Sequence, residues 1–321
     1  MDDIGASLRK EILHANIAML KANGIVPSGM PNGYAPIMAY IGTEGYLINC
    51  ELREGKQHCQ NGTPAFLRET LTLCRQLTDA PLLIRLDSGN DSAENTGILL
   101  EDGCCFIIKR NLRRESRDKW LDDAKQHCRN ISVPRDGKTV YIGSTWKDVT
   151  YTGSDHQEYT LGIRTGYEII ERSIDKYGQF LMPSDIEINT WWTNLDLSDT
   201  DIIHLYHAHG ACEQFHSEIK TDMDVERLPS GKFDTNELVL ELTILAYNIL
   251  RMIGQESLGK KDTPMKHNVR RRRLRAVISN LVMMASHVTE HARRIMIGLG
   301  QSNVWRFAFS RIYTAFADFS L

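Results

Sequence analysis

The chain has 321 residues, of which 42% are hydrophobic and 25% charged, and its formal net charge is −3. This composition indicates a soluble globular protein with room for one elaborated domain or two simple ones. Because the sequence contains no run of 18 apolar residues, it excludes a membrane-spanning helix. The acidic N-terminus lacks the apolar core of a signal peptide, and the seven cysteines without a CxxC pair indicate reduced thiols in a cytosolic protein.

Positive charge is concentrated toward the C-terminal end. Residues 226–321 carry 15 Lys and Arg against 8 Asp and Glu, and the densest cluster runs from Lys266 to Arg275. Such a run is typical either of a solvated face or of a surface that contacts a polyanion. The charge pattern therefore makes nucleic acid a candidate partner, and the alternative, that this cluster is only a solvated face, stays open.

The first part of the chain predicts a helix, a β-hairpin and a second helix. Gly24 ends the first helical pattern as a natural C′ residue, and Gly42-Thr-Glu-Gly45 supplies the turn of the hairpin. Pro64 suits the first turn of the amphipathic helix that follows. The predicted elements are a helix over 7–23, strands over 36–41 and 46–52, and a helix over 64–77.

Strands and helices then alternate, which predicts an α/β fold. Leu and Ile nearly fill residues 81–87, as expected for a strand covered on both faces. Asp87 ends this strand, at the place where open α/β sheets bind ligands; the alternative is that it only caps the turn. Asp91 is interpreted as the N-cap of the next helix. The predicted elements are strands over 81–87 and 104–109 and helices over 93–102 and 115–127.

The composition changes over residues 131–197, which are rich in Thr, Tyr, Ile and Trp with glycines between them. This pattern is typical of short antiparallel strands and predicts a β-rich insertion. Ser198 or Asp199 then caps a helix, and the rest of the chain is predicted to be mostly helical. The predicted C-terminal helices cover 234–254, 269–284 and 302–317.

Four polar side chains, Tyr206, His209, Glu213 and Lys220, share one face of the predicted helix that follows the insertion. The apolar residues of this helix form a separate arc that faces the core. Gly210 costs about 1 kcal/mol relative to alanine, so the helix can bend there. The plain alternative is that Glu213 and Lys220 are solvated surface groups.

An acid at a strand end, together with a distant acid on a helix, suits metal-assisted phosphoryl transfer. Asp87 and Glu213 are therefore predicted to be ligands of Mg2+, which prefers oxygen donors. Lys220 could hold a phosphate group, while Tyr206 and His209 could donate hydrogen bonds to phosphate oxygens. The sequence thus predicts a catalytic site built from these five side chains.

A rival interpretation uses the same segment. His209, Cys212 and His216 fall on one face of the helix, as the ligands of a zinc ion could. No fourth ligand with ordinary spacing accompanies them, and Cys212 already belongs to the apolar arc. The sequence therefore favours the acidic site over a zinc site.

Five stretches of the sequence are long and specific enough to indicate a family. They are Tyr34-Ala-Pro-Ile-Met-Ala-Tyr-Ile-Gly-Thr-Glu-Gly-Tyr-Leu-Ile-Asn49, Glu51-Leu-Arg-Glu-Gly-Lys-Gln-His58, Arg85-Leu-Asp-Ser-Gly-Asn-Asp91, Tyr206-His-Ala-His-Gly-Ala-Cys-Glu-Gln-Phe-His-Ser-Glu-Ile-Lys220, and residues 227–252 with Leu228-Pro-Ser-Gly-Lys-Phe233 and Ala246-Tyr-Asn-Ile-Leu-Arg251. In these motifs, which extend over nearly the whole chain, it resembles the DDE transposases of bacterial insertion sequences (DDE domain group 1).

The resemblance implies an α/β fold with a ribonuclease H-like core, a β-rich insertion between the second and third acidic residues, and a helical C-terminal region. It implies two Mg2+ ions and DNA strand cleavage and strand transfer at terminal repeats. The implied partners are double-stranded DNA, as terminal repeats and as target, and a second copy in a homodimer on DNA, in a bacterial cytoplasm at the nucleoid. The expected parts are an N-terminal helix and loop (1–33), the first part of the catalytic core (34–130), the insertion (131–197), and the helix with the third acid plus the C-terminal region (198–321).

The resemblance also assigns roles to single residues. The family's second acid corresponds to Asp87 and its third acid to Glu213, within a tyrosine–arginine–glutamate–lysine signature. Tyr206, Glu213 and Lys220 match this signature, whereas His209 stands where the family has arginine. A histidine can still donate a hydrogen bond to phosphate, but more weakly and in a pH-dependent way.

The larger departure from the family lies upstream. The family's first aspartate lies on the first core strand, before the segment that matches residues 34–49. In this chain Asn32-Gly33 leads directly into that segment, and the nearby acids are Asp2, Asp3 and Glu11. Our hypothesis is that an internal deletion removed both the first catalytic acid and its strand, which would leave Mg2+ short of ligands and impair strand transfer. The alternative is a catalytically inactive DNA-binding remnant that inhibits an intact copy or has no function.

Two groups of side chains are candidates for contact with DNA, because phosphate attraction needs clustered cations. The tryptophans of the insertion could in addition stack on a base flipped from a hairpin end, although a buried insertion core explains them equally well. The cationic candidates are Arg270, Arg271, Arg272 and Arg273, then Lys109, Arg110, Arg113 and Arg114, and the aromatic candidates are Trp191 and Trp192.

Overall fold

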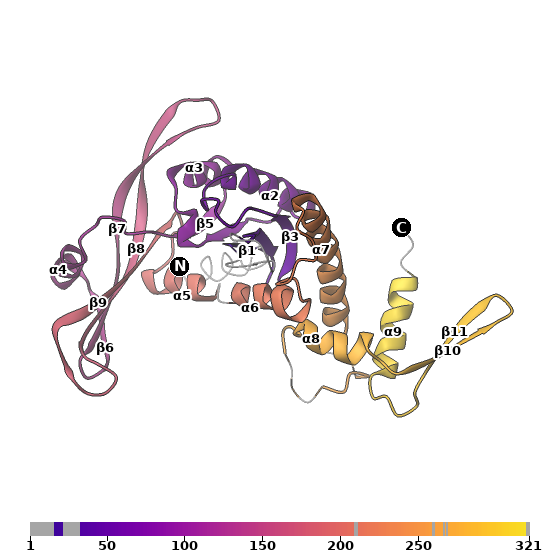
Figure 1. Cartoon of the computed structure of the whole chain (residues 1–321). Helices are drawn as coiled ribbons and strands as arrows, with labels where there is room; N and C mark the ends of the chain where they lie inside the picture. The colour runs from indigo at the N-terminus through magenta and orange to yellow at the C-terminus, as the bar shows by residue number, and fades with distance from the viewer. Residues whose placement is uncertain are drawn as a thin grey trace.

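The computed structural model describes residues 16–21, 33–208, 211–258, 261–265, 267 and 269–318. These residues form a mixed α/β fold with helices on both faces of a curled sheet, which a long β-rich arm extends to one side (Figure 1). The described strands of this sheet follow the order β3-β2-β1-β4-β5-β9-β8-β7-β6. Their bounds are β1 Asn16–Lys21, β2 Ile37–Ile41, β3 Tyr46–Glu51, β4 Leu83–Leu86, β5 Cys105–Lys109, β6 Asn130–Arg135, β7 Lys138–Thr152, β8 Glu158–Ile174 and β9 Phe180–Thr193.

The middle of the sheet is built from β4 and β5, which are covered on both faces. β1, β4 and β5 run parallel to one another, whereas β2 is antiparallel to both β1 and β3. Along β4, Ile84 and Leu86 face one side and Leu83 faces the other, because successive side chains of a strand alternate. This burial on two sides explains why residues 81–87 read as an almost continuous apolar run.

Two layers of helices enclose the sheet. On one face Phe66 packs with Ile84, and on the other Phe215 lies against Tyr40 with the ring centroids 5.3 Å apart, next to Tyr247. Each helix therefore buries one apolar stripe on the sheet. The first layer consists of α2 (Thr63–Leu77) and α3 (Ala93–Glu101), and the second of α5 (Asp199–His207), α6 (Ala211–Ser217) and α7 (Phe233–Glu256) (Figure 1).

The β-rich arm occupies the segment for which an insertion is predicted. β9 pairs antiparallel with β5, so the arm continues the central sheet instead of forming a separate body. β7 and β8 form a long antiparallel pair beyond it. The helix α4 (Arg117–His127) lies on this pair, with the ring of Trp120 5.7 Å from that of Tyr167. The arm thus has its own small core.

The predicted helix over residues 7–23 is wrong for residues 16–21, which form β1; the rest of that range lies outside the described residues. β1 hydrogen-bonds β2 on one side and β4 on the other. An empty slot between β2 and β4 would expose two unpaired strand edges, so sheet pairing outweighs the local helical pattern. The sheet therefore has a strand beside β4, where the sequence had led us to expect that the family's acid-bearing strand is missing.

Two further helix predictions need correction. The helix predicted to carry Tyr206 and Glu213 is divided into α5 and α6, with residues 209 and 210 between them outside the described residues. The helix predicted over 269–284 shortens to α8 (Leu274–Val277) and the π-helical turn η4 (Ile278–Val282), and an unpredicted hairpin follows, formed by β10 (Ser286–His291) and β11 (Arg294–Leu299). The last helix, α9, spans Arg306–Ala317. In the described part of the chain, no helix combines the length and apolar character that crossing a membrane requires.

A buried ion cluster connects α6 and α7 to the arginine run. Glu218 begins the π-helical turn η3 (Glu218–Asp222), and both its side chain and that of Arg251 are only 1% exposed. Glu218 accepts hydrogen bonds from Arg251 and, at 2.8 Å, from Arg271. Arg251 also donates to the Tyr247 hydroxyl at 3.0 Å. The single carboxylate therefore compensates two guanidinium groups, one of them fully buried.

We predict that Glu218→Gln lowers the free energy of unfolding by about 3–5 kcal/mol, because it leaves a buried guanidinium without its counter-charge. Urea unfolding followed by circular dichroism measures the change. Glu226→Gln, at an exposed position, is the control and is expected to change stability by less than about 0.5 kcal/mol. Equal stability of the two variants would contradict the role assigned to Glu218.

Candidate functional site

Asp87 lies directly after β4, on the side of the sheet that α5 and α6 cover. Its backbone is still extended (φ −75°, ψ 172°), so the alternation of the strand places it on the same side as Arg85. Arg85 is buried and donates a hydrogen bond of 2.8 Å to the carbonyl oxygen of Leu205, in the last turn of α5. Asn90 donates at 2.6 Å to Asp87 Oδ1 and orients that carboxylate. The strand end is thereby tied to the helix that carries Tyr206.

Tyr206 connects the two predicted acids. Burial raises the pKa of its hydroxyl, and the negative charge of Asp87 raises it further; Arg85 opposes this effect and Glu213 adds to it. Asp87, directly after β4, and Glu213, in the first turn of α6, thus both act electrostatically on the same phenol. Because its pKa lies well above the ordinary value, Tyr206 stays protonated at neutral pH. It can donate a hydrogen bond but cannot act as a base.

The remaining residues of the predicted signature are distributed over two elements. Glu213 is exposed in the first turn of α6, and Lys220 is half-buried in η3. Burial lowers the pKa of His216 to about 4, and the positive charge of Lys220 lowers it as well. His209, the predicted phosphate donor, lies outside the described residues.

Asp87 and Glu213 offer oxygen donors to a divalent cation, but they form an incomplete set. Among the described residues, no group of three His, Cys, Asp or Glu side chains could hold a metal ion. β1, which neighbours β4, has the sequence Asn-Ile-Ala-Met-Leu-Lys and so contains no carboxylate. The acids upstream of it, Asp2, Asp3 and Glu11, lie outside the described residues. The described donor set therefore does not fit a pair of Mg2+ ions, which needs more carboxylates than two.

The zinc alternative is not supported by the two ligands that the structure describes. Cys212 and His216 are both buried, and Cys212 packs in the core between α6, α7 and the sheet. Burial raises the pKa of the Cys212 thiol to about 12, which opposes the thiolate that zinc needs. His216 Nδ1 lies 3.4 Å from the Tyr40 hydroxyl. Both residues therefore serve packing, as the apolar arc predicts for Cys212.

Three of the four arginines of the run 270–273 bind other groups of the protein, although Arg273 remains exposed. Arg271 binds Glu218, and Arg273 makes two hydrogen bonds of 2.9 and 3.0 Å to Asp222. Arg272 is buried, lies over the ring of Trp305 and donates to Ser257 at 2.9 Å. The prediction that Arg272 contacts DNA is therefore wrong for this conformation, because its guanidinium is inaccessible. Arg270 is exposed.

In the second basic group, Lys109 to Arg114, some side chains are likewise buried and others exposed. Arg110 is buried, pairs with Glu115 at 2.5 Å and stacks over Trp192, which corrects its assignment as a DNA contact. Lys109 is half-buried, whereas Arg113 and Arg114 are exposed. Arg113 still lies 3.8 Å from Asp91. Arg113 and Arg114 are thus the residues of this group that DNA could reach.

The two tryptophans of the insertion have different environments. Trp191 is fully buried against Tyr206, with ring centroids 5.5 Å apart, so it cannot stack on a flipped base. Trp192 is half-buried and donates to Asp91 Oδ1 at 2.9 Å. Asp91 therefore supports Trp192 and does not cap α3, whose N-cap is Ser92. The base-stacking prediction is wrong for Trp191.

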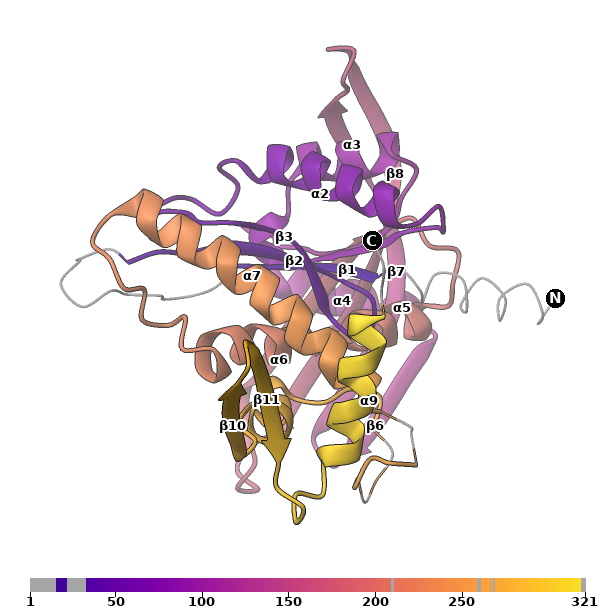
Figure 2. The same cartoon turned by 90° about the vertical axis from the view of Figure 1, so that its right-hand side faces the viewer.

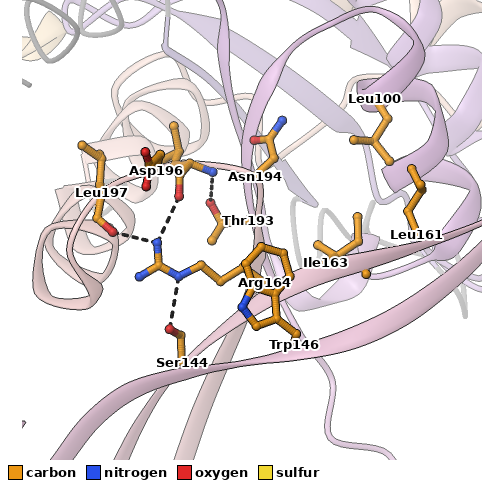
Figure 3. A pocket seen from close by; sticks show the side chains of 12 residues that line it. Leu100, Ser144, Trp146, Leu161, Ile163, Arg164, Thr193, Asn194, Asp196 and Leu197 are labelled. Atoms are coloured by element: carbon orange, nitrogen blue, oxygen red, sulfur yellow. Dashed lines mark hydrogen bonds between the residues drawn. The ribbon is translucent and has the colours of Figure 1, made fainter. Parts of the chain in front are cut away.

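A separate hollow of about 640 Å³ lies at the base of the arm (Figure 3). Arg164 lines the hollow, but its guanidinium group is engaged within the protein. It donates hydrogen bonds to Ser144 and to the carbonyl oxygens of Leu195 and Leu197. Trp146, on the rim, is 70% exposed. This hollow contains neither predicted acid, so it is distinct from the site around Tyr206.

Sequence reasoning missed the residues that position the site. Arg85 carried a signal, because it is the one charged residue in a strand otherwise made of Leu and Ile. No sequence pattern points to Glu115, because Arg110, Trp120 and Lys147 contact it only in the folded chain. These supporting contacts depend on tertiary structure.

Comparison with known proteins identifies the family. Residues 30–320 match the family Transposase DDE domain group 1, so the chain belongs to this family and the resemblance in its motifs is confirmed. No curated protein matches the sequence. Among solved structures, piggyBac transposase in a synaptic complex with hairpin DNA is similar over 78% of this chain and 50% of that chain, with 14% identity and a TM-score of 0.40. The present chain therefore spans half the length of that transposase.

Glu115 gives this region a pH-dependent contribution to stability. Burial raises the pKa of its carboxyl, but hydrogen bonds from Lys147, Arg110 and Trp120 outweigh burial and bring it from 4.5 to about 2. A lowered pKa means that the stabilisation is present above pH 4.5 and is lost as the pH falls from 4.5 toward 2.

We predict that Glu115→Gln lowers the free energy of unfolding at pH 7 by about 1–2 kcal/mol, a value reduced for the solvent screening of a partly exposed carboxylate. The difference from the wild type should shrink as the pH falls from 4.5 to 2. Urea unfolding at several pH values measures it, with the exposed Glu158→Gln as control. A difference that grows toward acid would contradict the assignment.

Proposed function

We propose that this protein is a DNA transposase of a bacterial insertion sequence whose Mg2+-dependent strand cleavage and strand transfer are impaired. Family membership supports the transposase function. Two findings support the impairment: both Asp87 and Glu213 contribute to the raised pKa of Tyr206, and the described residues contain no group of three side chains that could hold a metal ion. The alternative is a catalytically inactive remnant that binds DNA and blocks the ends used by an intact copy.

A ribonuclease H-like core is part of the proposal. It is supported by the order β3-β2-β1-β4-β5, with β2 antiparallel to its neighbours and β1, β4 and β5 parallel. It is further supported by an acid directly after β4 and by a β-rich arm between that acid and the next one. In such a core the chain supplies two acids from separate elements to one side of the sheet.

The chain's own groups would act mainly by positioning a DNA phosphate. Protonated Tyr206 can donate a hydrogen bond to a phosphate oxygen, and Lys220 can balance its charge. Asn90 holds Asp87, while Arg85 fixes the end of α5. Because the donor set does not fit two metal ions, no cleavage step follows from these groups alone.

Contact with DNA is proposed for the exposed cations Arg113, Arg114 and Arg270. These three side chains are exposed, although Arg113 also donates to the carbonyl oxygen of Asp91, whereas Arg110, Arg271 and Arg272 are buried or half-buried on protein groups and Arg273 is held by Asp222. The proposed ligand is double-stranded DNA that carries the terminal repeats, in a bacterial cytoplasm. Phosphate contacts of this kind release counterions and so weaken binding steeply with salt.

Cleavage of a plasmid that carries the chain's own element with both flanks tests the proposed impairment. With Mg2+ present, we predict that wild type, Asp87→Asn and Glu213→Gln all give the same background level of strand cuts. Gel-shift binding to the same DNA should persist in all three, which separates a dead site from misfolding. Robust cutting that is lost in Glu213→Gln would contradict the proposal, because two acids would then suffice.

A salt titration tests the DNA contacts. We predict that the double substitution Arg113→Gln/Arg114→Gln lowers the slope of log K against log salt by about 1–2, as each lost phosphate contact removes about one unit. Arg68→Gln, an exposed arginine on α2, is the matched control and should leave the slope unchanged. The same loss in both variants would show that net charge, and not this surface, governs binding.

A further inference from the structure

The turn that follows Asp87 packs against two other parts of the chain. This turn, η1 (Ser88–Asn90), comes directly after the acid and has Gly89 at its centre. A methyl group at Gly89 would lie 3.2 Å from Asp87 Oδ1 and 3.7 Å from the Cβ atom of Cys59. The carboxylate and the loop between β3 and α2 therefore both lie against the backbone of the turn.

Three side-chain amides connect the turn to its surroundings. Gln60 Nε2 donates a hydrogen bond of 2.7 Å to the carbonyl oxygen of Gly89. Asn95 Nδ2 donates to the carbonyl oxygen of Asn90 at 2.9 Å and to Gln60 Oε1 at 3.1 Å. Asn90 Nδ2 donates to Asp87 Oδ1 at 2.6 Å. We call Gln60, Asn90 and Asn95 the amide brace, because their hydrogen bonds form one network that ends on the carboxylate.

The amide brace joins elements that are separate in the sequence. Gln60 precedes α2, whereas Asn95 lies in the first turn of α3. The two helices lie side by side on the same face of the sheet (Figure 2), where Phe66 and Leu99 belong to one core cluster. Packing thus fixes the helices, and the amides extend that fixed geometry to the turn.

Asn95 occupies a position at which an amide is costly. The residue is 0% exposed, and Asn90 is 2% exposed. Within the described part of the chain, no group donates a hydrogen bond to Asn95 Oδ1, which is shielded from solvent. An unpaired buried acceptor destabilises a fold, and an apolar side chain of similar size would avoid this cost. Packing therefore does not explain Asn95, whereas the two hydrogen bonds that it donates do.

A buried arginine fixes the loop from which Gln60 extends. Arg53 is 4% exposed and binds both oxygens of the Glu51 carboxylate, at 2.8 and 3.1 Å. Its Nη1 donates to Thr63 Oγ1 at 3.0 Å and to the carbonyl oxygen of Cys59 at 3.3 Å. The loop is thereby attached to β3 at its start and to α2 at its end. This arrangement gives the family motif that begins at Glu51 a structural role, because it holds Gln60 in place.

We propose that Gln60 and Asn95 are positioning residues, which act through Asn90 to hold the Asp87 carboxylate in one orientation. A side chain at this place would otherwise rotate about its χ1 bond among staggered rotamers. A carboxylate that takes part in DNA strand chemistry benefits from a fixed orientation, because it then needs no reorganisation. The use of the held carboxylate rests on the proposed function, whereas the hydrogen-bonded network does not.

NMR of the side-chain amides in the full chain, without DNA or metal, tests the proposal. In the wild type the Asn90 amide should exchange slowly with solvent, and the proton donated to the carboxylate should lie downfield of its partner. Gln60→Ala and Asn95→Ala should each speed this exchange at least about tenfold and move that proton upfield, because the bond to Asp87 loosens. Asp87→Asn should move the same proton, since it removes the charge of the acceptor.

Two other amides supply the controls. Asn248 exchanges hydrogen bonds of 2.9 and 2.8 Å with the backbone of Leu47, and its signals should stay unchanged in every folded variant. Gln76→Ala, at an exposed position on α2, is the matched control for Gln60→Ala and should leave the Asn90 signals unchanged. Loss of the Asn248 signals marks a variant that does not fold, in which case Gln60→Ala, at a half-buried loop position, decides.

The double substitution shows whether the brace is one network. Because Gln60 and Asn95 act on the same turn, Gln60→Ala/Asn95→Ala should speed the Asn90 exchange by less than the product of the two single effects. Independent, multiplicative effects would overturn the proposal.

A second result would also overturn it. If the backbone amides of Ser88 and Gly89 shift in Gln60→Ala while the Asn90 side chain does not, the brace serves the turn alone and not the acid. Strand cutting that depends on Glu213 would instead contradict the proposed impairment, and it would leave the positioning role intact.

Discussion

The hydrogen bond from Arg85 to the carbonyl oxygen of Leu205 is the contact on which the candidate site depends. It joins the end of a central parallel strand to the last turn of a helix that is 120 residues away in sequence. A buried guanidinium needs such an acceptor, because burial without a partner is costly. The strand end that carries Asp87 is thereby joined to the helix that carries Tyr206, and burial together with the charges of Asp87 and Glu213 raises the pKa of that phenol.

The need of a buried guanidinium for a hydrogen-bond acceptor also explains where the other arginines lie. A guanidinium in a partly dry environment binds a carboxylate, an aromatic face or a carbonyl oxygen, and the fold offers all three to Arg110, Arg251, Arg271 and Arg272. These arginines connect the helices behind the sheet and the arm beside it. The clustering of positive charge in the C-terminal sequence is therefore largely structural, and the surface available to DNA is narrower than the composition suggests. A transposase fold can persist in this way even when its donor set is incomplete, because its stability and its chemistry use different residues.

The sequence predicted much of the fold because its strongest patterns are local. The apolar run 81–87 and the periodicity of 64–77 correspond to β4 and α2, and the Thr- and Tyr-rich segment corresponds to the arm. The errors arise where tertiary contacts decide. Residues 16–21 read as helix but complete a sheet, and the hairpin β10–β11 turns at Ala292 and Arg293, which adopt positive φ without the Asn-Gly signal of such a turn. The assignment of a site to Asp87, Tyr206 and Glu213 stays a prediction from the motifs, and nothing in the sequence shows that Glu218 compensates Arg251 or that Trp191 is buried against Tyr206.

We propose that this site offers two carboxylates to a divalent cation, one fewer than the three acids that the resemblance to the family implies. Counting bound Mn2+ by electron paramagnetic resonance tests it most directly, because the count reports the ligands and not the turnover. The account predicts at most one weakly bound ion per chain in the presence of DNA, which disappears in both Asp87→Asn and Glu213→Gln. Two tightly bound ions per chain that depend on both acids would contradict it and would require a third carboxylate at the site.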